Sequence, residues 1–116
     1  MHKLGFKVAR SRTIAALQAG PAYILFEDRA VREGKNLLDT GEVSPEEVVA
    51  LLHRCRGSPD QYSQSAHHRE ASIPVHTFKP AHGGTRWYIK VYFLDGTLDL
   101  EPAIFISVHK TTGTEA

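Results

Sequence analysis

The stretch from residue 72 to 110 constrains the fold of this chain more than any other. It contains three runs rich in β-branched and aromatic residues, at positions 73–78, 86–94 and 103–109. Turn-forming residues separate the runs, with Pro80 and a Gly-Gly pair in the first gap and Asp95-Gly96 in the second. This arrangement is typical of consecutive antiparallel strands. The C-terminal half is therefore predicted to form a sheet.

Side chains alternate between the two faces of a strand, so each run divides into two sets. In the middle run the apolar set is Trp87, Ile89, Val91 and Phe93, and the polar set is Arg86, Tyr88, Lys90 and Tyr92. In the last run Ile104, Ile106 and Val108 share one face, and Phe105, Ser107 and His109 share the other. A face with Tyr, Lys, Arg, His and Ser is unusual for an inert sheet surface. We therefore take it as the candidate working surface.

The composition is that of a globular protein. A chain of 116 residues with 41% apolar and 23% charged residues fits one domain. No apolar run approaches the ~20 residues of a membrane span, and residues 1–13 lack the apolar region of a signal peptide. The single cysteine, Cys55, favours a reducing cytoplasm. The net charge is only +1, but residues 71–94 contain Lys79, Arg86 and Lys90 without an acidic residue, which predicts a local basic patch.

The N-terminal half carries helix signals. Residues 11–19 are rich in helix formers and end at Gly20-Pro21, which predicts a short helix. Residues 22–26 suit a strand, and residues 27–38 a helical segment interrupted by Gly34. The strongest local signal is Ser44-Pro45-Glu46-Glu47, a capping box with proline at the first helical position. We expect this helix to end at Gly57-Ser58-Pro59.

Two segments lack an apolar pattern. Residues 57–71 are polar and are predicted to form a mobile loop, and residues 111–116 a disordered tail. We therefore expect an α+β fold in one domain of residues 1–110. In it, an antiparallel sheet of about four strands carries two or three N-terminal helices on its apolar face.

Few motifs of known chemistry occur in the chain. It has no glycine-rich phosphate loop, no G-x-S-x-G and no C-x-x-C. Its seven histidines do not follow a standard zinc spacing, so we expect no metal and no cofactor. A metal site remains an alternative, with these candidate ligands: His67, His68, His76 and His82.

The polar face of the predicted sheet suits a metal-free reaction. Cleavage of RNA by its own 2′-hydroxyl needs a proton acceptor, a proton donor and cations near the phosphate. Histidine can fill either proton role, and lysine can stabilise the developing charge. Aromatic rings can stack on unpaired bases. Tyr88, Lys90 and His109 could supply these groups from neighbouring strands.

A set of short motifs in this region resembles a known family. The motifs are Y-x-x-S from Tyr62, F-K-P from Phe78, W-Y-I-K-V from Trp87 and I-S-V-H from Ile106. Together with the capped helix they resemble the mRNA-interferase toxins of the motility quorum-sensing regulator (MqsR) family, within the broader RelE-like toxin group. The resemblance covers residues 44–110, and the first 40 residues only in the order of the elements.

The resemblance implies a toxin of a type II toxin–antitoxin system that cleaves single-stranded mRNA in the cytoplasm. Its active-site tyrosine falls on Tyr88 and its last-strand basic residue on His109, with Lys90 in the same constellation. A cognate antitoxin is the implied partner; the oligomeric state stays undetermined. The predicted RNA contacts are Lys79, Arg86, Tyr62, Gln64 and His76.

The chain departs from the family pattern at two positions. The loop lysine of that family falls near Ser63 or Gln64, and its glutamine falls on Val75. The alternative function is therefore a non-catalytic interaction module, either a degenerate toxin relative or a protein-binding domain.

Overall fold

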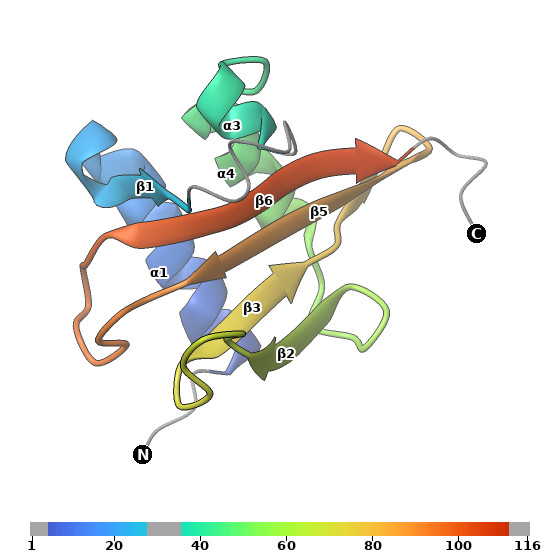
Figure 1. The fold of residues 1–116 in the computed structure, drawn as a ribbon. Coiled ribbons are helices and arrows are strands. Elements are labelled where there is room, and N and C mark those ends of the chain that lie inside the picture. Colours follow the sequence, from blue (N-terminus) through green and yellow to red (C-terminus); the bar gives the residue numbers. More distant parts are fainter. Residues whose placement is uncertain (1–4, 28–35, 112–116) are drawn as a thin grey trace.

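The computed structural model describes residues 5–27 and 36–111, which form an α+β fold with helices on one side of a sheet (Figure 1). The predicted fold class is confirmed at this level. The helical elements are α1 (Phe6–Ala19), the 3-10 turn η1 (Pro21–Tyr23), α3 (Leu37–Thr40) and α4 (Pro45–Arg54). None of the described helices is long and apolar enough to cross a membrane.

The sheet is larger than predicted and is mixed. Its strands are β1 (Ile24–Phe26), β2 (Tyr62–Ala66), β3 (Pro74–Phe78), β4 (Ala81–His82), β5 (Thr85–Tyr92) and β6 (Ala103–Thr111). The order is β1-β6-β5-β3-β2, and β4 pairs with β5 through a turn at Gly83-Gly84. Both glycines have positive φ, 60° and 79°, as a tight two-residue hairpin requires. The prediction of a purely antiparallel sheet was wrong, because β1 pairs with β6 in parallel.

Strand β2 lies inside the segment that was predicted to be a loop. It pairs antiparallel with β3 over residues 62–66 and forms one edge of the sheet. Four of its five residues are exposed, from Ser63 to Ala66. An edge strand without a buried face needs no alternating apolar pattern, which is why the sequence did not reveal it.

The ends of several predicted elements also differ. Helix α1 begins five residues earlier than predicted, at Phe6, and β6 extends to Thr111. Of the helical segment predicted over residues 27–38, positions 28–35 lie outside the described residues, and the short helix α3 follows them. The remaining predicted tail, 112–116, also lies outside the described residues.

Helix α4 forms as its capping box predicts. The Ser44 hydroxyl accepts a hydrogen bond from the Glu47 N–H at 3.1 Å, and the Glu47 carboxylate accepts one from the Ser44 N–H at 2.9 Å. These contacts satisfy N–H groups at the helix start that have no partner within the helix. Its apolar stripe, which includes Val48, Leu51 and Leu52, is buried.

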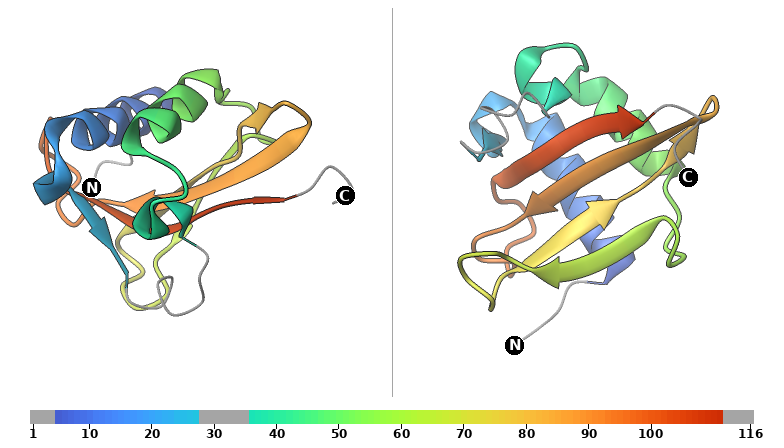
Figure 2. Two further views of the ribbon diagram at one scale, coloured as in Figure 1. Left: turned by 90° about the horizontal axis from the view of Figure 1, so that it is seen from above. Right: turned by 45° about the vertical axis from the view of Figure 1, so that its right-hand side comes forward.

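Helices α1 and α4 cover one face of the sheet and leave the other face without a helix in the described chain (Figure 2). The main core lies between these helices and the sheet. Its fully buried members from the strands include Phe78, Ile89, Val91, Phe105 and Val108. Burial of each such side chain contributes about 1.5–3 kcal/mol relative to exposure, which fixes which face of each strand points to the helices.

A β-bulge changes the predicted faces of β6. Lys90 pairs with Ser107, but the next residue, Val91, pairs with Phe105, so Ile106 is passed over. As a result Phe105 points into the main core, and Ile104 points to the helix-free face. The prediction that Ile104 shares a face with Val108, and that Phe105 lies on the opposite face, was therefore wrong.

The alternation predicted for β5 holds with two exceptions. Ile89, Val91 and Phe93 are buried in the main core, and Lys90 is exposed. Trp87 is only half-buried and packs at the margin of the main core. Tyr92 was expected to be exposed but is buried on the helix-free face, where it forms a second apolar cluster with Val75 and Ile104.

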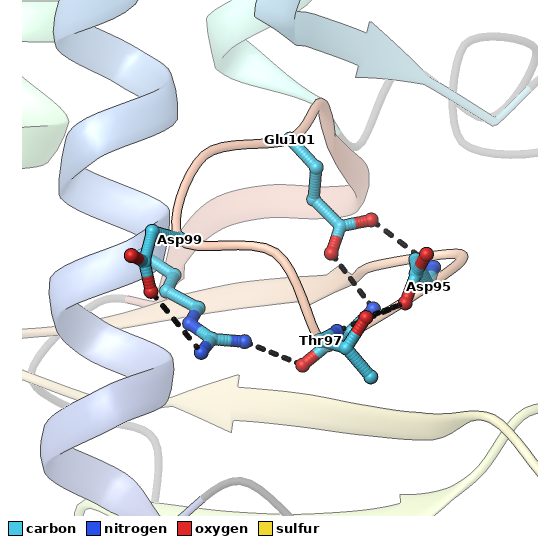
Figure 3. A network of polar contacts seen from close by, with 6 residues as sticks. Asp95, Thr97, Asp99 and Glu101 are labelled. Carbon is cyan, nitrogen blue, oxygen red and sulfur yellow. Dashed lines mark hydrogen bonds and ion pairs between the residues drawn. The ribbon is translucent and has the colours of Figure 1, made fainter.

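The connection between β5 and β6 is held by a polar network (Figure 3). Glu101 is buried and its carboxylate accepts hydrogen bonds from the N–H groups of Asp95 and Gly96, at 3.0 and 2.7 Å. Arg12 of α1 donates to the Gly96 carbonyl and lies 3.8 Å from the Asp99 carboxylate. The Glu101 carboxylate therefore holds the turn at Asp95-Gly96, and Arg12 connects this loop to α1.

Candidate nucleic-acid interface

The predicted catalytic residues lie together on the helix-free face of the sheet, which we call the open face. Tyr88 of β5 pairs directly with His109 of β6. Their rings are stacked, with centroids 5.2 Å apart and planes inclined by 20°. Directly paired side chains of antiparallel strands point to the same side, so the imidazole and the phenol share one surface. Both residues are half-buried.

Lys90 lies next to this pair on the same face. It is exposed and stands two residues along β5 from Tyr88. Its direct neighbours across the sheet are Thr77 of β3 and Ser107 of β6. Ser63 of β2 pairs in turn with Thr77, so three hydroxyl groups and one ammonium group form a row across four strands. A cation among hydroxyl donors can hold a phosphate group.

Two further basic residues lie toward the β4 hairpin. Arg86 donates hydrogen bonds through Nη1 to the backbone carbonyls of Asp60, at 2.8 Å, and Lys79, at 3.2 Å. These contacts hold its guanidinium close to the start of β5. Lys79 itself is half-buried. Arg86 lies two residues before Tyr88 on β5, and Lys79 directly follows β3.

Three of the predicted RNA contacts lie elsewhere. Tyr62, Gln64 and His76 belong to the side of the sheet that the helices cover, because Tyr62 pairs with Phe78 and His76 with Val91. The Gln64 amide donates to the Tyr62 hydroxyl at 2.8 Å, and that hydroxyl lies 2.8 Å from His76 Nδ1. His76 is 1% exposed. The three residues form a hydrogen-bonded chain at the edge of the core, and we no longer assign them to RNA contact.

The residue spacing in β3 could have predicted that His76 lies on the side of the sheet that the helices cover. His76 and Phe78 are two residues apart and so share a face, and a phenylalanine at that position indicates the core side. Burial lowers the pKa of His76 from 6.5 to about 4, so the ring is neutral at pH 7. A neutral, buried imidazole serves packing and hydrogen bonding rather than phosphate binding.

The two positions that depart from the family pattern both face the open side. Ser63 is exposed and pairs with Thr77, whereas Val75 is 5% exposed in the second apolar cluster. The apolar residue at position 75 therefore extends the packing around Tyr92. It does not supply a polar group to the surface.

The structure does not bring together the four histidines that were considered as zinc ligands. His76 is buried on the helix side, and His82 is exposed in β4. His67 and His68 instead lie beside Glu27, which follows β1. No sequence spacing pointed to Glu27, because it lies 40 residues from His67 in the chain.

Comparison with protein-family models, with curated proteins and with solved structures finds no match to this chain.

Proposed function

We propose that the protein is a metal-independent endoribonuclease toxin that cleaves single-stranded mRNA at the open face. The observation that carries the proposal is the direct pairing of Tyr88 with His109, next to the exposed Lys90. This places an aromatic ring, a titratable imidazole and a cation on one surface, as RNA cleavage requires. The motif resemblance described above supports the same reading.

The reaction needs two proton transfers. A base removes the proton of the 2′-hydroxyl, the 2′-oxygen attacks the phosphorus, and the bond from phosphorus to the 5′-oxygen breaks. An acid then supplies a proton to the leaving 5′-oxygen, which gives a 2′,3′-cyclic phosphate and a 5′-hydroxyl. His109 fills one of the two proton roles. Its stacking on Tyr88 fixes the orientation of the ring.

Lys90 and Tyr88 complete the proposed site. The Lys90 ammonium stabilises the negative charge that develops on the phosphate in the transition state. The Tyr88 ring orients a base by stacking, and Lys79 and Arg86 contact the flanking phosphates. A cognate antitoxin that covers this face is the proposed protein partner, and the cytoplasm the proposed compartment.

The test is cleavage of a single-stranded RNA oligonucleotide by the purified protein in EDTA. We expect cleavage to persist and to leave a 2′,3′-cyclic phosphate and a 5′-hydroxyl. A single 2′-deoxynucleotide at the scissile position should block the reaction, because the attacking oxygen is then absent. Activity that is lost in EDTA and restored by zinc would contradict the metal-free mechanism.

A non-catalytic interaction module is the second candidate, and one observation favours it. An apolar hollow of about 640 Å³ lies between α1, α3, α4 and β1, with Leu17, Ile24, Phe26, Leu38 and Val49 in its lining. Tyr88, Lys90 and His109 do not line this hollow. A folded protein that binds RNA or a protein partner without cleaving RNA would favour this candidate.

A further inference from the structure

Glu27, His67 and His68 form a compact group near the far end of the open face. One potential ligand atom of each residue lies within 4.8 Å of the others. Glu27 directly follows β1, and the two histidines directly follow β2. The group thus joins segments that lie at opposite edges of the strand order.

The Glu27 carboxylate is held firmly in this place. Its backbone N–H donates to the Phe105 carbonyl of β6 at 3.2 Å. Its Oε2 lies 2.8 Å from His67 Nε2 and accepts a hydrogen bond from the Tyr92 hydroxyl at 2.9 Å. The side chain is 12% exposed and that of His67 is 7% exposed. Both groups are therefore largely removed from water.

The other carboxylate oxygen, Oε1, is buried and has no hydrogen-bond partner among the described residues. A buried acceptor without a partner costs about 1–3 kcal/mol, and more when it is charged. Such an atom in a folded protein indicates a bound water or ion. Burial acts to raise the pKa of Glu27, but hydrogen bonds from His67 and Tyr92 outweigh it and lower the pKa below its usual value. The carboxylate is therefore ionised at neutral pH.

The three donors are suited to a transition metal. Imidazole nitrogen and carboxylate oxygen together bind divalent cations such as Zn²⁺, at bond lengths of about 2.0–2.2 Å. Neighbouring ligands on a tetrahedral ion with these bond lengths are about 3.3–3.6 Å apart. Glu27 Oε2 and His67 Nε2 are 2.8 Å apart, a hydrogen-bond distance, so the two atoms must separate by about 0.5–0.8 Å to share one ion. His68 is exposed and its ring stacks on His67 with centroids 4.4 Å apart, so it has room to turn toward the ion.

We propose that Glu27, His67 and His68 bind one first-row divalent cation of the Zn²⁺ type, with Tyr92 as the hydrogen-bond donor that orients the Glu27 carboxylate. Hydrogen bonds of this kind to a ligating carboxylate fix its orientation and contribute to metal affinity. Three protein ligands leave at least one position of a tetrahedral ion for water or for a fourth ligand.

Binding requires local rearrangements around His67. His67 Nδ1 accepts a hydrogen bond from the Arg69 N–H at 3.1 Å, so a neutral ring carries its proton on Nε2, toward Glu27. A cation bound at Nε2 displaces that proton, which moves to Nδ1. The Arg69 hydrogen bond is then lost, and the turn after β2 must shift. We expect a change of the protonated ring nitrogen of His67, visible by ¹⁵N NMR.

This site is separate from the proposed nuclease residues and does not depend on them. Tyr92 and Tyr88 are four residues apart on β5, which corresponds to about 13 Å along a strand. A cation here would tie the end of β1 to the turn after β2. Its expected role is to stabilise the fold, so its loss should leave the chemistry at His109 unchanged.

The test is a calorimetric titration of the untagged, metal-free protein with Zn²⁺. We expect one equivalent to bind, and His68→Ala to weaken binding at least about tenfold. Glu27→Gln should weaken it similarly, and Tyr92→Phe by a smaller factor. His82→Ala is the matched control, since His82 is an exposed histidine at the distant β4 hairpin, and it should bind like the parent protein.

A second measurement separates this site from non-specific binding. Zn²⁺ should raise the melting temperature of the parent protein and of His82→Ala, and that of His68→Ala by clearly less at the same Zn²⁺ concentration. Because His68 is exposed, its replacement should leave the fold intact. No stoichiometric binding, or an equal loss of affinity in His82→Ala and His68→Ala, would overturn the proposal. RNA cleavage by His68→Ala in EDTA tests the nuclease independently of this result.

Discussion

The His76 imidazole is buried on the helix side of the sheet, and its pKa is lowered by burial from 6.5 to about 4. Protonation is therefore easier in the unfolded chain than in the folded protein. The contribution of the neutral His76 ring to the free energy of unfolding is complete above pH 6.5 and is lost as the pH falls toward 4. The full difference between the two pKa values of His76 corresponds to on the order of 3 kcal/mol in the free energy of unfolding. We expect the free energy of unfolding to decrease between pH 6.5 and pH 4.5.

This prediction can be checked by urea unfolding at several pH values. In His76→Gln, the decrease between pH 6.5 and 4.5 should be much smaller, because the titrating group is gone. His82→Ala should keep the decrease of the parent protein. The range stops at pH 4.5 because the lowered pKa of Glu27 adds its own loss of stability at more acidic pH. A pH dependence that is identical in His76→Gln would contradict the placement of this ring.

Tyr88 shows how the type of contact decides which substitution is tolerated. Its ring, rather than its hydroxyl, makes the stacked contact with His109. If the ring also stacks on a base, Tyr88→Phe should retain most of the RNA affinity. Tyr88→Ala should lose roughly tenfold or more, since a base–aromatic contact contributes about 1–3 kcal/mol. Fluorescence anisotropy with labelled RNA measures the affinity of both variants. An equal loss of affinity in Tyr88→Phe and Tyr88→Ala would indicate that the hydroxyl is used.

Helix α4 depends on contacts that are local in the chain. Ser44→Ala removes the hydroxyl that accepts the Glu47 N–H and should lower stability by about 1 kcal/mol. For a domain of this size the melting temperature should fall by about 4 °C. Ser11→Ala on the exposed side of α1 is the control, and it should not destabilise the protein, because alanine is the better helix former. If the two variants melt alike, the capping box contributes nothing measurable.

The same locality explains which elements were predictable. The capping box of α4 and the alternation in β5 are encoded by neighbouring residues, and both were found from the sequence. The bulge at Ile106 was not, because the register of β5 against β6 sets it. The parallel pairing of β1 was missed for a related reason. Its partner lies about 80 residues away, and a three-residue strand carries no sign of its direction.

For the molecule as a whole, the sheet separates packing from candidate chemistry. The helices cover one face (Figure 2), and the candidate residues lie on the other, beside the second apolar cluster. The strand pattern and the motif resemblance together predicted that Tyr88, Lys90 and His109 would share that face. They did not predict that Tyr62 and His76 face the helices, or that Glu27 meets His67 and Tyr92. Those contacts depend on three-dimensional packing over long chain separations.

The placement of the proposed site on the open face makes a clean test possible. His109 and His82 both lie outside the main core, so neither His109→Ala nor His82→Ala should lower the melting temperature much. The measurement is the cleavage rate of single-stranded RNA under single-turnover conditions, with RNA affinity measured in parallel. If His109 transfers a proton, His109→Ala should be slower by on the order of 10²–10⁴ with little change in affinity. His82→Ala should cleave like the parent protein, and equal rates for the two variants would contradict the account.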